Sequence, residues 1–224
     1  MYEPLNADEL NALRRIDTAT IANAIEHFDI RSNTDGFMGW DIRCMFPEMG
    51  VMVGYAVTAT LDTTTHGRVH DREARFQMFE AIDASPKPVV LALKDVSSKP
   101  RHGCHFGDGL ATVSMRLGAI GLVTDGGVRD VDTVRDMGFH YFSPGMVPAH
   151  GNFGFLEAQV PVLISGVLVN PGDLIHADAN GVVTIPNEIA RDVVAAANEV
   201  LQREEEYRDW VNGDDFSVEK LRQR

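Results

Sequence analysis

Three groups of glycine and charged residues lie close together in the middle of the chain. They are Gly107-Asp108-Gly109, Asp125-Gly126-Gly127 and Arg129-Asp130. The first precedes a predicted helix, where free backbone N–H groups and the helix dipole favour an anion. The second follows a predicted strand, and open α/β sheets bind ligands beyond the carboxyl ends of their strands. The third places a cation beside a carboxylate at a strand-to-helix junction, so we expect the groups to line one cleft.

This combination of side chains suits chemistry on a 2-oxo acid. An arginine such as Arg129 can hold a carboxylate through two parallel hydrogen bonds. A hard divalent cation, held by a carboxylate and water, can polarise the 2-oxo group and offset the charge of an enolate. A further group must move a proton between water, a hydroxyl group and the enolate. The sequence contains residue types suited to all three tasks.

Each of these residues also has a purely structural interpretation. Asp108, and either Asp130 or Asp132, would suit the N-cap of a helix. Arg129 would suit a surface ion pair. Gly126-Gly127 would suit a tight turn that binds nothing. Single residues do not separate the two interpretations, whereas the spacing of the whole set favours the functional one.

The elements that must position these residues follow from the hydrophobic pattern. Apolar periodicity predicts helices over 7–29 (in two pieces, the second capped by Thr18 or Thr20), 71–84, 110–117, 131–137 and 187–210. In the second of these regions, Phe76, Phe79 and Ile82 are expected to face inward. Strands are predicted over 51–61, 88–93, 119–124 and 140–143, followed by antiparallel strands from 159 to 185 with a turn at Asp178–Gly181. We therefore expect one domain over residues 1–224, with a core from about 7 to 200 and a C-terminal helical arm from about 187 to 224.

Composition and charge narrow the classes of partner. A net charge of −13 with no basic patch argues against nucleic acid. No apolar run approaches the ~20 residues that span a bilayer, and the polar N-terminal segment does not resemble a secretory signal. Two cysteines give no disulfide framework. We expect a cytoplasmic protein with neither a nucleic-acid nor a membrane partner, in which a local cation or helix N-terminus must attract any anionic substrate.

Other cofactor chemistries have less support. A Schiff-base aldolase needs an activated lysine, and of four lysines only Lys94 is a candidate. A lysine at the end of an apolar strand is more simply interpreted as reaching solvent. The chain has neither G-x-G-x-x-G nor a P-loop motif, so nucleotide binding is not indicated.

The spacing of the central residues is similar to that of a known family. Asp108 and Arg129 have 20 residues between them and Asp130 follows directly. The same pattern occurs in the 4-hydroxy-4-methyl-2-oxoglutarate / 4-carboxy-4-hydroxy-2-oxoadipate aldolases and their relatives, the regulator of ribonuclease activity A proteins. Further segments resemble the family, and the resemblance covers roughly residues 7 to 200; these segments are Thr18–Ala24, Gly118–Asp130 and Val169–Pro186.

The resemblance implies a fold and a role for each site residue. The fold would be α/β, a single swivelling β/β/α domain like the phosphohistidine domains, with N-terminal helices and a C-terminal helical arm. Asp130 would ligate Mg²⁺ or Mn²⁺, Arg129 would hold the pyruvyl group and stabilise the enolate, and Asp108 would position a water that relays the proton. The substrate carboxylate would lie at Gly107, cradled by the backbone N–H groups of three residues: Gly109, Leu110 and Ala111.

The function implied by the resemblance is a class II (metal-dependent) aldolase that cleaves 4-hydroxy-2-oxo acids to pyruvate. Oxaloacetate decarboxylation would follow from the same enolate stabilisation. A homotrimer or hexamer with sites at subunit interfaces is expected, acting on a small 2-oxo acid. Two alternatives stay open: a non-catalytic regulator that binds a ribonuclease complex, and a related metal-dependent lyase or hydrolase on another oxo acid.

Parts of the chain depart from the family pattern, at Asn23, Arg101–Phe106 and Pro148–Phe153. The two loops are expected to shape the pocket beyond the pyruvyl group, so the departures leave the precise substrate open. His102, Cys104 and His105 lack a second ligand pair at the spacing of structural zinc sites. We expect this loop to contact a distal carboxylate of the substrate instead of zinc.

Overall fold

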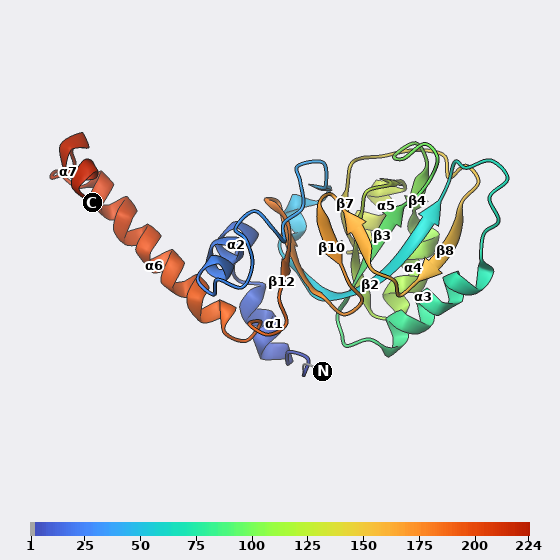
Figure 1. Ribbon diagram of the computed structural model, residues 1–224, viewed down its shortest axis with the longest axis horizontal. Helices are drawn as coiled ribbons and strands as arrows, with labels where there is room; N and C mark the ends of the chain where they lie inside the picture. Colours follow the sequence, from blue (N-terminus) through green and yellow to red (C-terminus); the bar gives the residue numbers. More distant parts are fainter. Residues whose placement is uncertain (1–2) are drawn as a thin grey trace.

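The computed structural model describes residues 3–224, whose longest strands form one mixed sheet (Figure 1). Four neighbouring strands at its centre are parallel, in the order β7, β5, β3 and β2. Antiparallel strands extend both sides, and β8 pairs with the C-terminal half of β2. The complete order is β1 (Arg43–Cys44), β7 (His140–Ser143), β5 (Ala119–Thr124), β3 (Val89–Asp95), β2 (Met52–Asp62), β11 (Leu174–Asp178) and β12 (Gly181–Ile185), with β8 at Gly154–Ala158.

Two pairs of short strands lie outside this sheet. β9 (Val162–Ile164) and β10 (Val167–Val169) form an antiparallel hairpin, whereas β4 (Cys104–Phe106) and β6 (Gly127–Val128) are parallel. The helices are α1 (Ala7–Leu13), α2 (Thr18–Glu26), α3 (Arg72–Ala84), α4 (Asp108–Arg116), α5 (Val131–Asp136), α6 (Val193–Asn212) and α7 (Val218–Gln223), with a short 3₁₀ helix, η1, at Pro47–Met49.

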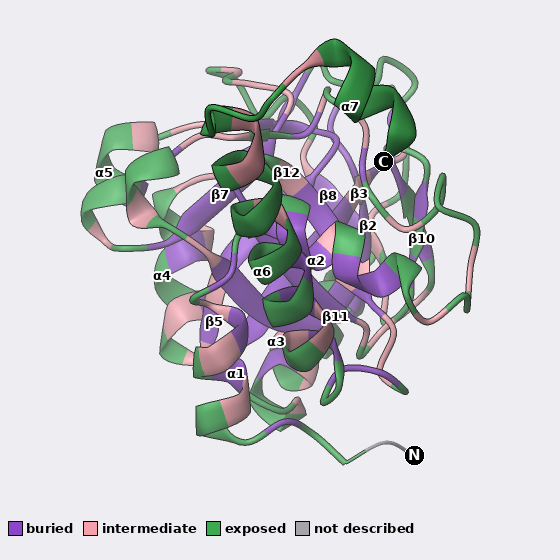
Figure 2. Cartoon of the chain, turned by 90° about the vertical axis from the view of Figure 1, so that its left-hand side faces the viewer, coloured by how far each residue is buried: buried purple, intermediate pink, exposed green. Residues whose placement is uncertain are grey.

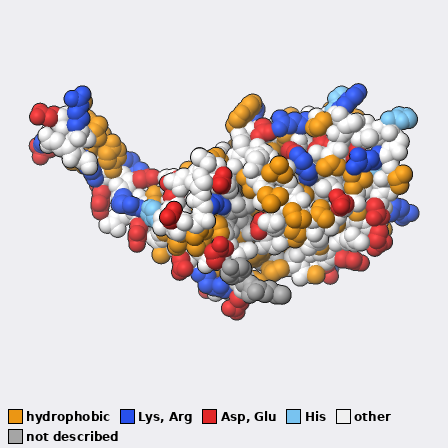
Figure 3. Space-filling view, viewed as in Figure 1, with side chains coloured by type: hydrophobic (Ala, Val, Ile, Leu, Met, Phe, Trp, Pro, Cys, Tyr) orange, Lys and Arg blue, Asp and Glu red, His pale blue; other side chains and the backbone are white. Residues whose placement is uncertain are grey.

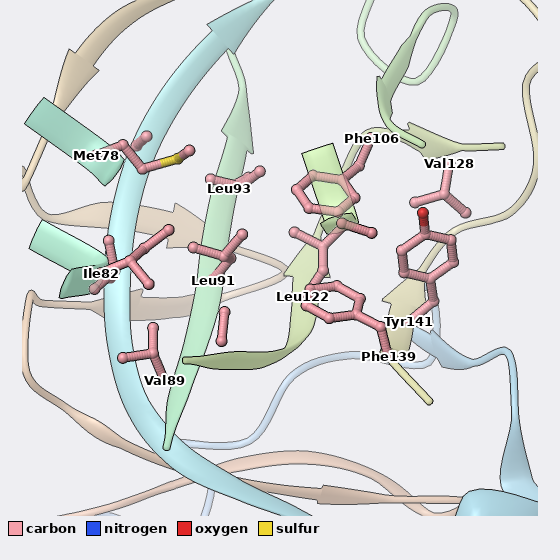
Figure 4. Packing of buried hydrophobic residues seen from close by; sticks show 14 of the residues in the cluster. Met78, Ile82, Val89, Leu91, Leu93, Phe106, Leu122, Val128, Phe139 and Tyr141 are labelled. Carbon is pink, nitrogen blue, oxygen red and sulfur yellow. The ribbon is translucent and has the colours of Figure 1, made fainter. Parts of the chain in front are cut away.

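Alternation along β3 shows how the sheet separates two apolar layers. Val89, Leu91 and Leu93 face one side, where they pack in the same cluster as Met78 and Ile82 of α3 (Figure 4). Their neighbours Val90 and Ala92 face the other side, in a cluster with the apolar residues of the β9–β10 hairpin. Because side chains alternate along a strand, one apolar run supplies both layers. Helices therefore cover one face and a β-hairpin the other, which confirms the predicted β/β/α arrangement.

A third apolar cluster joins the two ends of the chain. Helices α1, α2 and the first turns of α6 pack against β11, β12 and the start of β2. Asn6 and Glu9 form a capping box at the start of α1, and Asp17 caps α2 by accepting the Thr20 N–H at 3.0 Å. The expected cap at Thr18 or Thr20 is thus wrong by one to three residues. Both threonines already lie inside the helix, and Asp17, just before it, accepts the free N–H of its first turn.

Beyond its first turns, α6 projects away from the body of the molecule (Figures 1 and 2). Its buried residues, Val193, Ala197 and Val200, all lie in its first half. The expected helix start at residue 187 is wrong, because residues 187–192 form turns before α6 begins at Val193. At the far end, Trp210 packs edge-on against Phe216 of the segment leading to α7. No helix within residues 3–224 has the length and apolarity that crossing a membrane requires.

Helix α3 shows where the hydrophobic pattern was misleading. Ile82 is buried and Phe79 is partly buried, as predicted, but the Phe76 side chain is exposed. Ala74 and Met78 are buried in its place. These two positions fall four and eight residues before Ile82, so the buried stripe follows helical spacing through a small side chain and a flexible one.

Candidate active site

Two short strands bring the central polar segments together. In the parallel pair of β4 and β6, Cys104 lies opposite Gly127 and Phe106 lies opposite Val128. The backbone N–H of Arg129 extends this pairing by donating to the Phe106 carbonyl oxygen at 3.0 Å. Gly107-Asp108 and Arg129-Asp130 follow these strands, so they lie side by side at the starts of α4 and α5. The sequence-predicted proximity of Asp108, Arg129 and Asp130 is therefore what the structure contains.

Asp130 has an unusual backbone in a tightly fitted position. Its φ of 54° lies in the left-handed region, which Asp tolerates better than most residues. Its Oδ2 atom accepts the Asp108 N–H at 3.3 Å. A Cβ atom at position 107 would overlap this oxygen, so only glycine lets the carboxylate approach the start of α4. Asp130 occupies the N-cap position of α5, as the structural interpretation predicts, but its side chain makes no capping hydrogen bond there and is directed to the start of α4 instead.

Arg129 holds one edge of its guanidinium against Asp130 and leaves the rest available. The Nε atom lies 3.3 Å from Asp130 Oδ2, and the side chain is 40% exposed. Within residues 3–224 the terminal nitrogens have no carboxylate partner. The backbone of Arg129 is also held, because the hydroxyl of the buried Tyr141 donates to the Arg129 carbonyl oxygen at 3.4 Å. Burial raises the Tyr141 pKa well above its ordinary value, so this phenol remains a neutral donor.

The start of α4 offers backbone N–H groups to the same site. Asp108 is the first residue of the helix and Gly107 occupies the N-cap, so Asp108 is not the cap. The Asp108 carboxylate accepts the Gly109 N–H at 2.6 Å. The Ala111 N–H already donates to the Gly107 carbonyl oxygen at 3.0 Å inside the helix. Of the three N–H groups expected to form the cradle, only that of Leu110 has no partner among residues 3–224, because Gly109 and Ala111 already donate to Asp108 and Gly107.

Asp108, Leu110 and Arg129 line one pocket of about 300 Å³, and Asp130 lies next to it through its contact with Arg129. Its walls come from β4 and the start of α4, from Arg129 after β6, from Arg75 on α3, and from the loop that carries His150 and Phe153. Within that list, Asp108 is the single acidic residue. Sequence analysis did not single out Arg75. An exposed arginine on an amphipathic helix carries no pattern that separates a pocket residue from an ordinary surface cation.

A buried ionic cluster supports the floor of this pocket. His105 Nε2 lies 3.4 Å from Asp95 Oδ1, and both side chains are fully buried. Burial alone would raise the Asp95 pKa, but hydrogen bonds from His105, Ser97 and the Arg101 N–H hold it well below its ordinary value. Asp125 accepts the Asp95 N–H at 2.8 Å and pairs with Lys94. Asp125 and His105 therefore have structural partners in place of ligands.

The same cluster decides two expectations. Lys94 was expected to reach solvent, and its side chain is 29% exposed; its ammonium also pairs with Asp125, and it does not line the pocket. An engaged ammonium is a poor nucleophile, so the Schiff-base interpretation gains no support. Within residues 3–224, no three side chains of the metal-binding types come together, and Cys104 instead directs its Sγ toward the Phe106 carbonyl oxygen at 3.2 Å. The zinc interpretation of residues 102–105 is therefore without support as well.

With this geometry in place, comparison with known proteins gives a clear family match. The family model RraA-like, described as Aldolase/RraA, matches residues 18–184. The chain belongs to the RraA-like family. This RraA-like match includes the pocket residues from Arg75 to Phe153 and both strands, β4 and β6, that position Asp108 and Arg129.

Relatives among curated proteins match about half of this chain. Protein DlpA of Legionella pneumophila is 36% identical over 116 residues, which are 50% of this chain and 18% of DlpA. A protein of Halalkalibacterium halodurans, provisionally named 4-hydroxy-4-methyl-2-oxoglutarate aldolase, is 34% identical over 104 residues, 46% of this chain and 49% of that protein. The chain thus spans half or less of the length of these relatives.

Solved structures match the RraA-like fold over nearly the whole chain. An uncharacterised protein from Pseudomonas syringae pv. tomato superposes with a TM-score of 0.75 at 27% identity, covering 100% of this chain and 96% of that one. RraAS2 of Streptomyces coelicolor, described as an unusual member of the RNase ES inhibitor RraA protein family, superposes with a TM-score of 0.72 at 27% identity. That match covers 93% of this chain and 99% of RraAS2.

Proposed function

We propose that this RraA-like chain is a divalent-metal-dependent aldolase that cleaves 4-hydroxy-2-oxo acids and releases pyruvate. The single observation that carries the proposal is a pocket lined by Asp108 and Arg129 beside a helix N-terminus, with the Asp130 carboxylate in contact with both residues. Relatives provisionally named as 4-hydroxy-4-methyl-2-oxoglutarate aldolases support the substrate class. Oxaloacetate decarboxylation is part of the same proposal, because it passes through the same enolate.

Asp130 suits a role as metal ligand. Its side chain is 34% exposed, and its described contacts engage only Oδ2, which leaves Oδ1 available. Mg²⁺ and Mn²⁺ accept one or two carboxylates with water and substrate oxygens in the remaining positions, so a single protein carboxylate is sufficient. When bound, the cation supplies Lewis-acid polarisation of the 2-oxo group and countercharge for the enolate. The lack of three clustered ligands among residues 3–224 agrees with such an open site.

Arg129 and the first turn of α4 bind and orient the substrate. The free edge of the Arg129 guanidinium binds the pyruvyl carboxylate or oxo oxygen through charge-assisted hydrogen bonds. The Leu110 N–H, at the positive end of the helix dipole, donates to the same carboxylate. Because Arg129 also contacts Asp130 at 3.3 Å, the guanidinium and the metal-binding carboxylate are held in one arrangement before substrate arrives.

Asp108 moves the proton. Cleavage breaks the C3–C4 bond, removes the proton of the 4-hydroxyl group and leaves the bonding electrons on the pyruvate enolate, which is then protonated at C3. Asp108 is an exposed carboxylate at the pocket wall, so it reaches both bound water and the substrate hydroxyl group. Its hydrogen bond from Gly109 fixes one oxygen and leaves the other to accept the proton through water.

The test is pyruvate release from 4-hydroxy-4-methyl-2-oxoglutarate and from oxaloacetate, with Mg²⁺ or with EDTA. Arg129→Ala is expected to lower kcat/KM about 100- to 1,000-fold, the usual loss for a donor that stabilises developing charge. Arg135→Ala is a matched control, because Arg135 is equally exposed, pairs with Asp132 and Asp136 on α5, and does not line the pocket. Equal activity of the two variants, or turnover that persists in EDTA, would contradict the proposal.

A second candidate function is regulation of a ribonuclease complex. The likeness to RraAS2, which covers 99% of that protein, favours it. Retention of a ribonuclease by the purified chain at physiological salt, unchanged by Arg129→Ala, together with no metal-dependent pyruvate release, would support this function over the aldolase. Under either function we propose a homotrimer or hexamer, which sedimentation equilibrium measures directly.

A further inference from the structure

The pocket at Arg129 continues into a second, more open one. The second pocket has a volume of about 660 Å³ and shares His150 and Phe153 with the first. Its other walls come from the 65–70 loop between β2 and α3 and from the segment after His150. Small-molecule sites commonly have volumes of roughly 300–1,000 Å³. The pyruvyl end of a substrate at Arg129 therefore leaves room for a longer second half toward α3 and this loop.

The lining of that room is basic on a protein that is strongly acidic overall. The second pocket has no carboxylate among its lining residues, and Asp108 is the only one in the first. Histidine and basic side chains gather at the end of the body opposite the C-terminal arm, where the loop between β2 and α3 lies (Figures 1 and 3). The basic groups lining the two pockets, apart from Arg129, are His66, Arg68, His70, Arg75, His105 and His150.

Among these groups, the Arg75 guanidinium is the one whose charge is not offset by a carboxylate within residues 3–224. Arg68 Nε lies 3.7 Å from the buried Asp62 carboxylate, which offsets its charge, and Arg129 lies beside Asp130. Arg75 has no carboxylate within ion-pair distance among residues 3–224. Its guanidinium carbon instead lies 5.5 Å from the centre of the Phe79 ring, one turn further along α3. Stacking on an aromatic ring orients a guanidinium and leaves its N–H edges free to bind an anion.

His150 is less suited to bind an anion. Its Nδ1 atom lies 2.9 Å from the Gly151 carbonyl oxygen, which only accepts, so Nδ1 carries the proton. In the neutral ring, Nε2 is then an acceptor and offers nothing to a carboxylate. Arg75 is always charged and donates from its whole free edge. His150 and Phe153 therefore line the junction of the two pockets, and Arg75 is the residue better suited to bind the anion.

We infer that Arg75 binds a second acid group, carried by the half of the substrate on the far side of the bond that breaks, away from the group held at Arg129. The inference rests on the proposed placement of the pyruvyl half at Arg129. The substrate is then a 2-oxo acid with negative groups at both ends, clamped between Arg129 and Arg75. Arg75 is a specificity-determining residue that contacts no reacting atom, so it affects substrates with a second acid group and leaves others unchanged.

The experiment measures binding, so that it does not depend on turnover. Calorimetric titration in Mg²⁺ compares 2-oxoglutarate, which has a second carboxylate, with 2-oxopentanoate, which has a methyl group in its place. Arg75→Gln is expected to weaken 2-oxoglutarate binding about 10- to 100-fold, the range for loss of a charge-assisted pair, and to change 2-oxopentanoate binding less than about twofold. Arg75→Lys keeps the charge and is expected to retain part of the preference.

Arg72→Gln is the matched control, because Arg72 is an exposed arginine on the same helix and lines neither pocket. It is expected to leave both titrations as in the unmodified protein. Equal weakening of both acids by Arg75→Gln, or no preference for 2-oxoglutarate in the unmodified protein, would overturn the inference. Pyruvate release with no effect of Arg75→Gln on binding would overturn this inference alone. An Arg75-dependent preference without any pyruvate release would overturn the proposed aldolase and leave the second acid site standing.

Discussion

At the scale of single residues, Asp130 combines a backbone in the left-handed region with the carboxylate that we propose as the metal ligand. Asp130→Asn keeps a residue that tolerates this φ value but removes the charge. We expect the thermal midpoint to change little and pyruvate release to fall about 100-fold or more, since a neutral amide is a weak ligand for a hard divalent cation. Titration of bound Mn²⁺ by electron paramagnetic resonance measures the loss of metal. Asp132→Asn, whose side chain is 87% exposed, is expected to bind Mn²⁺ normally.

A change at Gly107 is expected to affect metal binding indirectly, through the position of the Asp130 carboxylate. In Gly107→Ala the new Cβ would overlap Asp130 Oδ2, so the carboxylate must turn away from the start of α4. We expect weaker Mn²⁺ binding and about a 10- to 100-fold lower kcat/KM, because misplacing a catalytic group by an ångström has effects of that order. Gly213→Ala provides the comparison, since Gly213 has an ordinary φ of −78° and space for a Cβ. Unchanged metal binding in Gly107→Ala would contradict this account of the glycine.

How far the site could be predicted depends on how each residue is encoded. Asp108, Arg129 and Asp130 each follow a strand or a glycine at a helix start, so their proximity follows from the local pattern. Arg75 contacts the same pocket from a distant helix, and no local pattern marks it. The pairing of Lys94 with Asp125 was not predicted, because the two residues are 31 positions apart in the sequence. Long-range charge pairing of this kind is set by packing, which a single sequence does not reveal.

At the scale of elements, the long strands and helices could be predicted, whereas the shortest elements could not. Strands β2, β3 and β5 are rich in apolar and β-branched residues and are almost fully buried, a pattern typical of strands inside a sheet that is covered on both faces. β4 and β6 have three and two residues, respectively, within a stretch rich in glycine and histidine, and this is too short for any periodicity to appear. These are the strands that align Arg129 with Phe106, so the sequence pattern predicted that the candidate residues lie close together and missed the strands that hold them there.

Helix α3 allows the buried stripe to be tested directly. Met78 is fully buried against the sheet, so Met78→Ala is expected to lower the free energy of unfolding by about 2–5 kcal/mol. Phe76 is 49% exposed, so Phe76→Ala is expected to lower the free energy of unfolding by about 0.5 kcal/mol or less. Urea denaturation of both variants measures the difference. The reverse order would mean that α3 packs through the face originally expected from its aromatic residues.

At the scale of the whole molecule, the fold class could be predicted because helices and strands alternate through the first two thirds of the chain. Such alternation favours a parallel sheet core, and the turn at Asp178–Gly181 indicated an antiparallel addition. The packing of α1, α2 and α6 into a shared apolar cluster joins residues nearly 200 positions apart. This end-to-end closure also buries His176 between β11 and the N-terminal helices, where it contacts Leu13 and Thr18.

The buried histidines make overall stability depend on pH. His176 Nε2 donates to the Leu13 carbonyl oxygen at 3.1 Å and Nδ1 accepts the Thr18 hydroxyl at 2.9 Å, an arrangement that the neutral ring satisfies completely. Burial lowers the pKa of His176, and burial followed by the charge of Arg14 lowers the pKa of His140. Between the folded and the unfolded pKa values, the unfolded chain binds more protons. Stability is therefore full above about pH 6.5, the unfolded value, and falls as the pH decreases below it.

We expect the urea concentration at the unfolding midpoint to decrease when the pH is lowered from 7.5 to 5.5. Each histidine can lower the free energy of unfolding by at most about 1.4 kcal/mol per pH unit. Carboxylates contribute little in this range, because their ordinary pKa values lie near 4. His176→Gln retains a donor and an acceptor but has no titrating group, so it is expected to remove the His176 share of the slope. If this variant kept the full dependence of unfolding free energy on pH, His176 would have the same protonation behaviour in the folded and the unfolded state, and our account of it would be wrong. The remaining slope then belongs to His140, whose buried Nδ1 has no hydrogen-bond partner among residues 3–224 and therefore gains nothing from the fold on protonation.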